Sequence, residues 1–208
     1  MIKKNDLNEY FFKGIKSIQN LKIGVEHEKF ILNKKTLRPL SYDEDNGIKN
    51  ILERWSTEGW TPLYDDKQIT IVALSKNRES ITLEPGGQLE LSGAPLDNIH
   101  ETCEETTKHL HDLKKLGKEF NFILLGMGVE PNLTKDDFPW MPKQRYKIMK
   151  KYMQQVGKLG HHMMKRTCTN QVNIDYSSEQ DMVNKLRTML NLEAIATAIF
   201  SNSPFDEG

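Results

Sequence analysis

The stretch from Ser80 to Pro95, S-I-T-L-E-P-G-G-Q-L-E-L-S-G-A-P, most constrains how this chain can fold. Apolar and polar side chains alternate on either side of Pro85-Gly86-Gly87, and a period of two is typical of β-strands. Proline presets φ and glycine accepts positive φ without steric cost, so these three residues predict a turn. The sequence therefore predicts a β-hairpin whose apolar face carries Ile81, Leu83, Leu89 and Leu91. The opposite face carries oxygen-bearing side chains, namely Thr82, Glu84, Gln88, Glu90 and Ser92.

The polar face of this hairpin suits either solvent or a hard cation. Antiparallel sheets commonly keep one face in water, whereas oxygen ligands are those that Mg²⁺ prefers. A second segment favours the cation, because the strand pattern of Lys22 to Leu32 places Glu26 and Glu28 on one side, roughly 7 Å apart. Like charges repel across a sheet, and a bound metal ion removes that objection. We therefore expect the two acidic pairs to converge on one sheet face.

Composition excludes several classes of protein. The chain has 208 residues, 37% of them hydrophobic, which suits one large domain or part of a bigger one. Lys+Arg and Asp+Glu are balanced at 29 each, so no excess of positive charge indicates a nucleic-acid partner. Neither a signal peptide nor an apolar run of membrane-spanning length is found, which predicts a cytoplasmic protein with no membrane partner. Cys103 and Cys168 are too few for a disulfide framework or a cysteine metal site, and each is expected to be a buried thiol.

Periodicity predicts an α+β fold with an antiparallel sheet. Helical spacing predicts helices over Asp6 to Ser17, Tyr42 to Trp55, Asp97 to Phe120, Lys143 to Arg166, and from Ser178 towards Ile199. The first is expected to be a packing helix with Asp6 as its N-cap, and Ser177 and Ser178 offer N-caps for the last. The helix before Trp55 is expected to bury Ile48, Ile51, Leu52 and Trp55, and the helix from Lys143 to bury Tyr146, Met149, Met153, Val156, Gly160 and Met163. Besides the hairpin, strands are predicted over Lys22 to Leu32, Gln68 to Leu74, Phe122 to Gly128 and Arg166 to Tyr176. In the long helix after Pro95 the apolar stripe is expected to run through Ile99, Cys103, Thr106, Leu110 and Leu113. His100, His109 and His111 are then surface residues, because no carboxylate or cysteine completes a zinc pattern with them.

Two further features indicate a bound ligand. Arg145 stands near the amino end of a predicted helix, where a cation opposes the helix dipole, so an anion is expected beside it. The last predicted strand carries a long polar stripe on one face: Thr167, Thr169, Gln171, Asn173 and Asp175. A stripe of this length between two long helices predicts a ligand-facing strand. An exposed arginine and a solvated strand face remain the alternatives.

Five motifs in order give the chain a specific resemblance. They are G-V-E-H-E-K-F from Gly24, L-E-P-G-G-Q-L-E-L-S-G-A-P from Leu83, M-P-K-Q-R-Y-K-I-M from Met141, R-T-C-T-N-Q-V-N-I-D from Arg166 and S-N-S-P-F from Ser201. Together they resemble the glutamate–cysteine ligases of the plant and proteobacterial type. The resemblance implies the glutamine-synthetase-like carboxylate–amine ligase fold, an antiparallel sheet with a concave acidic face and helices packed outside. Family members continue well beyond S-N-S-P-F, so residues 1–208 are expected to be the amino-terminal part of a single catalytic domain.

The resemblance also implies a reaction. ATP phosphorylates the γ-carboxylate of glutamate, and the amine of cysteine displaces phosphate to give γ-glutamylcysteine, the first step of glutathione synthesis. The substrates are glutamate, cysteine and ATP, with Mg²⁺ as cofactor. A related carboxylate–amine ligase with another acceptor, a phosphagen-type kinase, and a non-catalytic truncated form are the alternatives.

The same resemblance assigns roles to individual residues. The expected Mg²⁺ ligands are Glu26, Glu28, Glu84, Glu90 and Gln171. The expected catalytic residues are Arg145, which pairs a glutamate carboxylate, and Gln171, which contacts metal or phosphate. The expected substrate-binding residues are Arg145, Tyr146, Thr169 and Asn173, with Tyr146 either lining the cysteine pocket or packing in the core.

Overall fold

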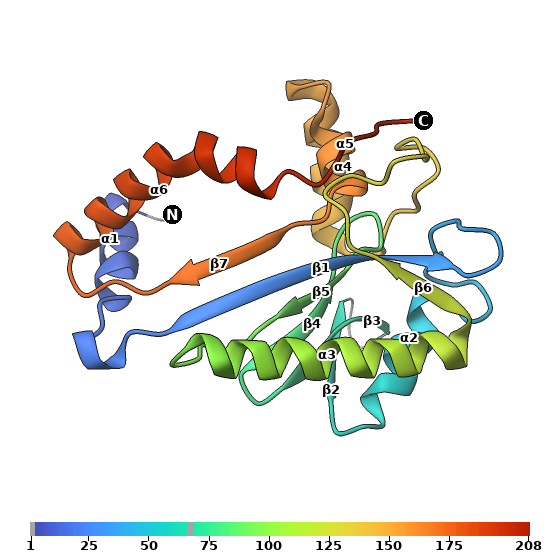
Figure 1. Ribbon diagram of the computed structural model, residues 1–208, viewed down its shortest axis with the longest axis horizontal. Helices are drawn as coiled ribbons and strands as arrows, with labels where there is room; N and C mark the ends of the chain where they lie inside the picture. The colour runs from blue at the N-terminus through green and yellow to red at the C-terminus, as the bar shows by residue number, and fades with distance from the viewer. Residues whose placement is uncertain (1–2, 66–68) are drawn as a thin grey trace.

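The computed structural model describes residues 3–65 and 69–208, and an antiparallel sheet of seven strands lies at its centre (Figure 1). The strands are β1 (Ile23–Asn33), β2 (Thr61–Asp65), β3 (Thr70–Lys76), β4 (Glu79–Leu83), β5 (Leu89–Ser92), β6 (Phe122–Leu125) and β7 (Asn170–Ile174). The helices are α1 (Lys4–Lys13), α2 (Ile48–Ser56), α3 (Ile99–Phe120), α4 (Gln144–Val156), α5 (Gly160–Arg166) and α6 (Glu179–Phe200), with a 3-10 turn at Ile18–Asn20. The predicted α+β class is confirmed. Gln68, where a strand was predicted to begin, lies outside the described residues.

The long strand β1 organises the sheet. The strand order is β2-β3-β4-β5-β1-β6, and β7 also pairs with β1. One edge of β1 pairs with β5 through residues 26–29, and the other edge pairs with β7 through residues 23–27 and with β6 through residues 30–33. Glu26 and Glu28 therefore stand in the middle of the sheet, with paired backbone on both sides.

The apolar face of the predicted hairpin forms the core. Its four apolar side chains, Ile81, Leu83, Leu89 and Leu91, are all 0% exposed. They pack with the predicted stripe of α2, made of Ile48, Ile51, Leu52 and Trp55, and with Leu113 and Leu116 of α3. The hairpin and the α2 stripe are confirmed. Burying these side chains supplies most of what holds the sheet, since a fully buried aliphatic side chain stabilises by about 1.5–3 kcal/mol.

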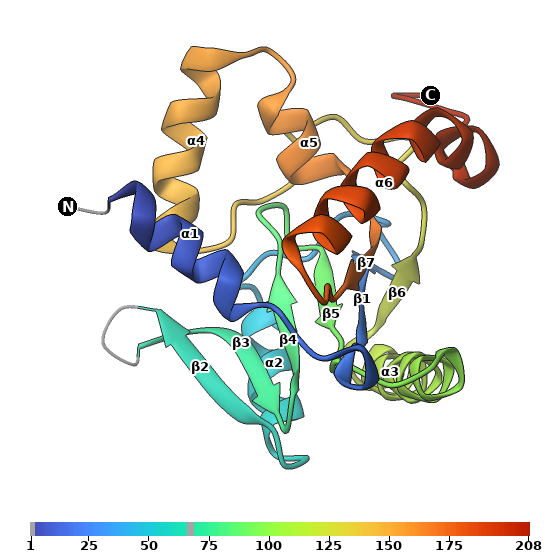
Figure 2. The same cartoon turned by 90° about the vertical axis from the view of Figure 1, so that its left-hand side faces the viewer.

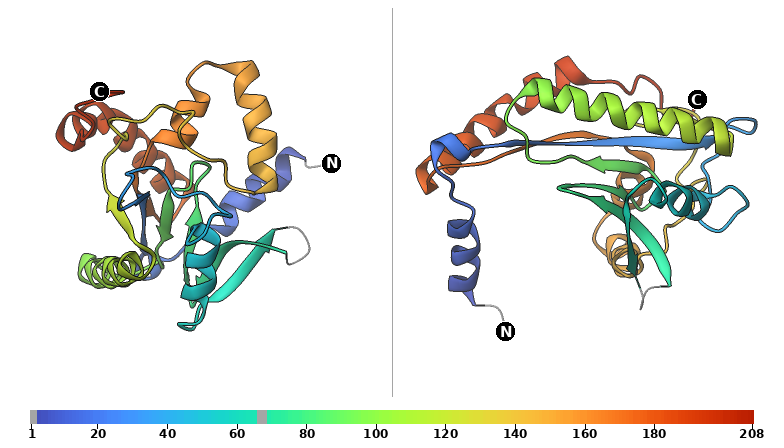
Figure 3. Two further views of the ribbon diagram at one scale, coloured as in Figure 1. Left: turned by 90° about the vertical axis from the view of Figure 1, so that its right-hand side faces the viewer. Right: turned by 90° about the horizontal axis from the view of Figure 1, so that it is seen from below.

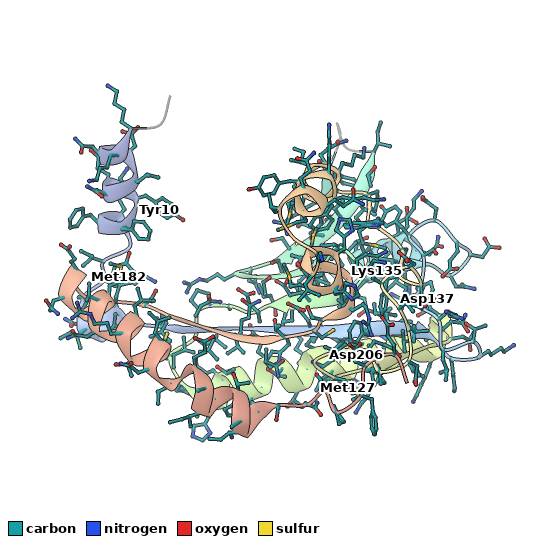
Figure 4. All side chains as sticks on the ribbon, turned by 90° about the horizontal axis from the view of Figure 1, so that it is seen from above. Tyr10, Met127, Lys135, Asp137, Met182 and Asp206 are labelled. Atoms are coloured by element: carbon teal, nitrogen blue, oxygen red, sulfur yellow. The ribbon has the colours of Figure 1, made fainter. Side chains whose placement is uncertain are left out.

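The helices divide between the two faces of the sheet. Figures 3 and 4 show α3 and α6 on one side, whereas α1 and α4 project from the other. Figure 2 shows α4 and α5 as neighbouring helices joined by a short connection, and Figure 4 shows α1 at the other end of the molecule. The sheet face opposite α3 is therefore flanked by helices at its sides.

The predicted helix from Lys143 to Arg166 is two helices, so that prediction is wrong. Helix α4 ends at Val156, the backbone of the next residue, Gly157, is extended, and α5 begins at Gly160. Of the predicted apolar stripe only Tyr146 is buried, while Val156 and Met163 are exposed. The following strand is shorter than predicted because Arg166 still belongs to α5.

Helix α3 is rotated relative to the predicted stripe. Its buried positions are Thr102, His109, Leu113, Leu116 and Gly117, whereas Ile99 and Cys103 are exposed. The predictions of a surface His109 and a buried Cys103 are therefore wrong, and the burial of Cys168 is confirmed. The physical reason is the ring of His109, which stacks on Trp55 of α2 with centroids 5.8 Å apart. That contact turns one polar position of the helix into the core.

The first and last helices pack less than predicted. No residue of α1 or α6 is buried, so the prediction that α1 is a packing helix is wrong. The N-cap of α1 is Lys3, and Asp6, the predicted cap, instead accepts a hydrogen bond from the Lys3 backbone N–H. Ser178 caps α6 as predicted, since its hydroxyl accepts from the Asp181 N–H. None of the helices in the described part of the chain has the length and hydropathy of a bilayer-crossing segment.

Candidate functional site

The predicted carboxylates gather around one cavity of about 380 Å³. It lies on the sheet face opposite α3, because His27, between Glu26 and Glu28, points the other way and contacts Thr106 of α3. The cavity is lined by Glu26, Glu28, Thr82, Glu84, Glu90, Ser92, Lys143, Arg145 and Gln171. The structure thus brings together all five predicted metal ligands and Arg145. Their roles as ligands and catalytic residues stay predictions.

Strand register explains why these side chains meet. Glu28 of β1 stands opposite Glu90 of β5, and Glu90 stands opposite Thr82 of β4. On the other edge of β1, Glu26 stands opposite Gln171 of β7. Cross-strand partners point to the same face, so four adjacent strands deliver oxygen atoms to one place.

Hydrogen bonds hold the carboxylates from neighbouring positions. The two oxygens of Glu28 accept from the Thr169 hydroxyl at 2.8 Å and from its N–H at 3.0 Å. Glu26 accepts from the Asn173 amide at 2.8 Å, and Glu90 accepts from the Ser92 hydroxyl. Thr169 and Asn173, predicted to bind substrate, do not line the cavity and here position its acids. Their contact with substrate stays a prediction.

The acids repel one another inside this cavity. Burial, followed by the like charges of Glu90 and Glu28, raises the pKa of Glu84 to about 7. Burial also raises the pKa of Glu28, and the hydrogen bonds from Thr169 only partly oppose that rise. The protein therefore leaves negative charge at this face incompletely neutralised.

Arg145 lies at the side of the cavity, over Tyr146. Its side chain is 65% exposed, and its Nη2 stands 3.9 Å from Glu84 Oε1. The guanidinium carbon lies 4.9 Å from the centroid of the Tyr146 ring and Nη2 donates to the tyrosine hydroxyl at 3.1 Å. Two protein carboxylates lie beside this helix start: Glu84, and Asp65 of β2, which accepts from the Gln144 N–H at 2.7 Å. The bound anion expected beside Arg145 stays a prediction. Tyr146 is 1% exposed, so it packs in the core, and a role towards cysteine stays a prediction.

Lys143 is a residue of this site that the sequence reasoning missed. Its ammonium donates to the Leu83 carbonyl at 2.7 Å and stands 5.2 Å from the centroid of the Tyr146 ring. Burial, followed by the charge of Arg145, lowers the pKa of Lys143 to about 8. The sequence could have pointed to Lys143, because this cation follows Pro142 at the very start of a predicted helix.

The hairpin turn lies beneath the site and is wholly buried. Gln88, predicted on the polar face, is 2% exposed and donates to the Thr167 carbonyl at 2.8 Å. Its side chain does not line the cavity. A Cβ on Gly86 would lie 2.4 Å from the Lys165 carbonyl oxygen, so only glycine fits there. The turn therefore packs against the end of α5 and the segment that leads into β7.

The donor set fits Mg²⁺ in its chemistry. Carboxylate, amide and hydroxyl oxygens line the cavity, and these are the ligands of a hard cation. Within residues 3–65 and 69–208, however, no three acidic, histidine or cysteine side chains converge closely enough to hold an ion by themselves. Mg²⁺ usually keeps one or two protein carboxylates and takes its other ligands from phosphates and water. The arrangement suits a cation that arrives with a phosphate-bearing ligand.

Among the described residues three other cavities are larger, two of about 600 Å³ and one of about 460 Å³ along α3. Of the two of about 600 Å³, one lies between β7 and the end of α6 and shares Glu28 with the acidic cavity, and the other lies between α3 and β6. All three are lined mainly by apolar atoms and none gathers several carboxylates. The acidic cavity is therefore the better candidate for a reaction between anions.

Comparison with known proteins supports the resemblance. The profile of glutamate-cysteine ligase family 2 matches residues 22–208. The chain is 50% identical to glutamate–cysteine ligase B, chloroplastic, of Oryza sativa subsp. japonica, over 99% of this chain and 40% of the rice protein. It is 47% identical to glutamate–cysteine ligase, chloroplastic, of Arabidopsis thaliana, over 99% of this chain and 38% of the relative.

Two consequences follow from these matches. The chain spans about 40% of the length of the curated relatives that it matches. Both relatives carry the word chloroplastic in their names, so the prediction of a cytoplasmic location is wrong. Composition could not have shown this.

Proposed function

The chain belongs to glutamate-cysteine ligase family 2, and we propose that the protein joins the γ-carboxylate of L-glutamate to the amine of L-cysteine with ATP, the first step of glutathione synthesis. The observation that carries this proposal is the single cavity that combines four carboxylates with the cations of Lys143 and Arg145. A ligase of this kind must bring two anions, a carboxylate and a nucleoside triphosphate, into contact. Opposite charges facing each other across one small cavity are suited to that task.

We propose Mg²⁺ as the cofactor, with ATP as co-substrate. Glu26, Glu28, Glu84, Glu90 and Gln171 are the residues that would hold it. When bound, the ion screens the phosphates and stabilises charge on the transferring phosphoryl group. The raised pKa of Glu84 supports this assignment, because a nearby divalent cation favours the ionised carboxylate that burial disfavours.

The protein's own residues then orient the reactants. Arg145 presents a planar fork that pairs with a carboxylate, which is the reason to assign it to glutamate. Tyr146 supports that fork from below, and Asn173 and Thr169 hold Glu26 and Glu28 in place. Their direct contacts with substrate are part of the proposal.

The fold assignment is also a proposal. We infer the glutamine-synthetase-like carboxylate–amine ligase fold, with residues 1–208 as the amino-terminal part of a single catalytic domain. The open acidic face and the greater length of the relatives support this view. So do the exposed apolar side chains of α6, Leu190 and Phe200 among them.

The test is an assay of the full gene product with glutamate, cysteine, ATP and Mg²⁺, in which γ-glutamylcysteine is identified by mass spectrometry. We expect product only when all four are present. Turnover with another amine and none with cysteine would make the protein a different carboxylate–amine ligase. Turnover with neither amine would contradict the proposal.

A matched pair of variants tests the metal assignment. Glu90→Gln should lower activity by about 10- to 100-fold and raise the Mg²⁺ concentration required for half-maximal rate, because one anionic oxygen is lost. Glu104→Gln, an exposed acid on α3, should leave both unchanged. Equal behaviour of the two variants would show that Glu90 is an ordinary surface acid.

A further inference from the structure

Lys143 is held rigidly at the wall of the acidic cavity. It is the N-cap residue of α4, and its ammonium is fixed by the Leu83 carbonyl at 2.7 Å and the face of Tyr146 at 5.2 Å. An ammonium has three donors, of which the carbonyl takes one. Lys143 lines the same cavity as Glu84 and Glu90.

Charges of both signs act on the ammonium at this position. The amino end of the helix and Arg145 repel it, whereas Glu84, Glu90 and Asp65 attract it. The Leu83 carbonyl does not need the lysine, because the Tyr146 hydroxyl also donates to it at 2.6 Å. Core packing therefore does not account for an ammonium at this place.

We propose that Lys143 contacts the phosphoryl group transferred from ATP, an inference that rests on the proposed ligase function. The two cations of the site differ in shape and depth. Arg145, 65% exposed and planar, suits a carboxylate that enters from solvent. Lys143 is a compact point charge set against the carboxylates, where a metal-bound phosphate would lie, and its donors rotate to meet tetrahedral oxygens.

The test compares two ligands of the full-length protein by titration calorimetry in the presence of glutamate. Mg·ADP occupies the nucleotide site, and Mg·ADP with aluminium fluoride adds a mimic of the phosphoryl group in transfer. Lys143→Met should weaken the second complex by about 100-fold, while Mg·ADP binding changes by less than about threefold. The turnover number should fall by a similar factor, and the KM for glutamate should stay within about threefold of wild type.

Two control variants isolate the effect. Lys147→Met removes an exposed lysine one turn further along α4 and should match wild type. Lys143→Arg keeps the charge in a different shape and should recover part of the lost affinity for the fluoride complex. If circular dichroism shows that Lys143→Met does not fold, the arginine variant tests the proposal instead. Lys143→Arg that binds the fluoride complex as tightly as wild type and turns over at the wild-type rate would then overturn the proposal.

The outcomes separate this inference from the proposed function. If the wild-type protein binds the fluoride complex but makes no γ-glutamylcysteine, the ligase assignment is contradicted. The role of Lys143 is then decided by how tightly the variants bind the fluoride complex. Equal binding of the fluoride complex by wild type and Lys143→Met overturns the inference alone. An equal loss of Mg·ADP and of the fluoride complex also overturns it, because the lysine would then serve nucleotide binding in general. Wild type that binds neither ligand overturns both.

Discussion

His109 makes the stability of this protein depend on pH. The ring is 5% exposed and stacks on Trp55, and its Nε2 is buried with no hydrogen-bond partner among the described residues. Burial, followed by the charges of Lys29 and His27, lowers the pKa of His109 from 6.5 to about 3. The imidazole is therefore neutral in the folded protein at any pH above about 4.

The sign of the effect follows from proton binding. Between pH 6.5 and about 3 the unfolded chain binds a proton at His109 and the folded protein does not. The contribution of the neutral His109 to stability is therefore fully present above pH 6.5 and falls as the pH is lowered through this window. At pH 5, which lies 1.5 units below the unfolded value, the loss is about 2 kcal/mol. This figure does not depend on the exact folded pKa, provided that it lies below about 4.

The assay is urea unfolding at pH 8 and pH 5, followed by tryptophan fluorescence. Acids such as Glu84, whose pKa is raised, change stability in the opposite direction, so the informative quantity is the difference between wild type and His109→Gln. The variant is less stable at pH 8 because it loses the stacked ring. Its disadvantage should shrink by about 2 kcal/mol at pH 5. His111→Gln, on the exposed side of the same helix, should keep the pH dependence of wild type.

Parallel losses of stability in His109→Gln and wild type between pH 8 and pH 5 would refute the lowered pKa of His109. An NMR titration of the His109 ring with a midpoint near 6.5 would refute it equally. Either result would mean that the ring reaches solvent in the folded protein.

Two other changes test the site and its support. Arg145→Lys in the full-length protein should raise the KM for glutamate by about tenfold or more and that for ATP far less, because a point charge cannot replace a bidentate fork; equal effects on both would reassign the residue. Gly86→Ala should lower the free energy of unfolding by about 1–3 kcal/mol, since its Cβ would meet the Lys165 backbone at 2.4 Å. Gly157→Ala, where a Cβ meets nothing within 4 Å, is the matched control, and equal stability of the two glycine variants would contradict the packing argument.

Much of the site could be predicted because strand alternation is a local property. The side on which Glu26, Glu84 or Gln171 points is decided by its immediate neighbours, and a period of two tolerates no drift over a few residues. The hairpin turn brings β4 and β5 together through a contact that is also local in the sequence. The two acidic pairs then meet in one cavity because of the long-range pairing of β1 with β5, which strand alternation alone does not supply.

The wrong predictions concern features that are determined by packing between distant parts of the chain. The buried positions of α3, Thr102, His109 and Leu113 among them, keep the spacing of the predicted stripe but lie on a rotated face, because packing against α2 determines which side of the helix is buried. A polar residue such as His109 enters the core only because Trp55 offers it a ring. The end of the helix before Gly157 could not be predicted, because the helical spacing of apolar residues continues from α4 into α5. Lys143 escaped notice because its importance comes from the Leu83 carbonyl on a distant strand.

The two faces of the hairpin differ in their effect on stability, and this difference supports the proposed metal site. One face is entirely apolar and buried, and it stabilises the fold. The other holds Glu84 with a pKa of about 7, so its ionised form is disfavoured by about 3 kcal/mol relative to water. Replacing that carboxylate by a neutral group would relieve the repulsion, so the demands of folding alone do not explain it. A bound cation would attract these carboxylates and offset the repulsion between them. The strands that hold the carboxylates close together would then present them to the ion.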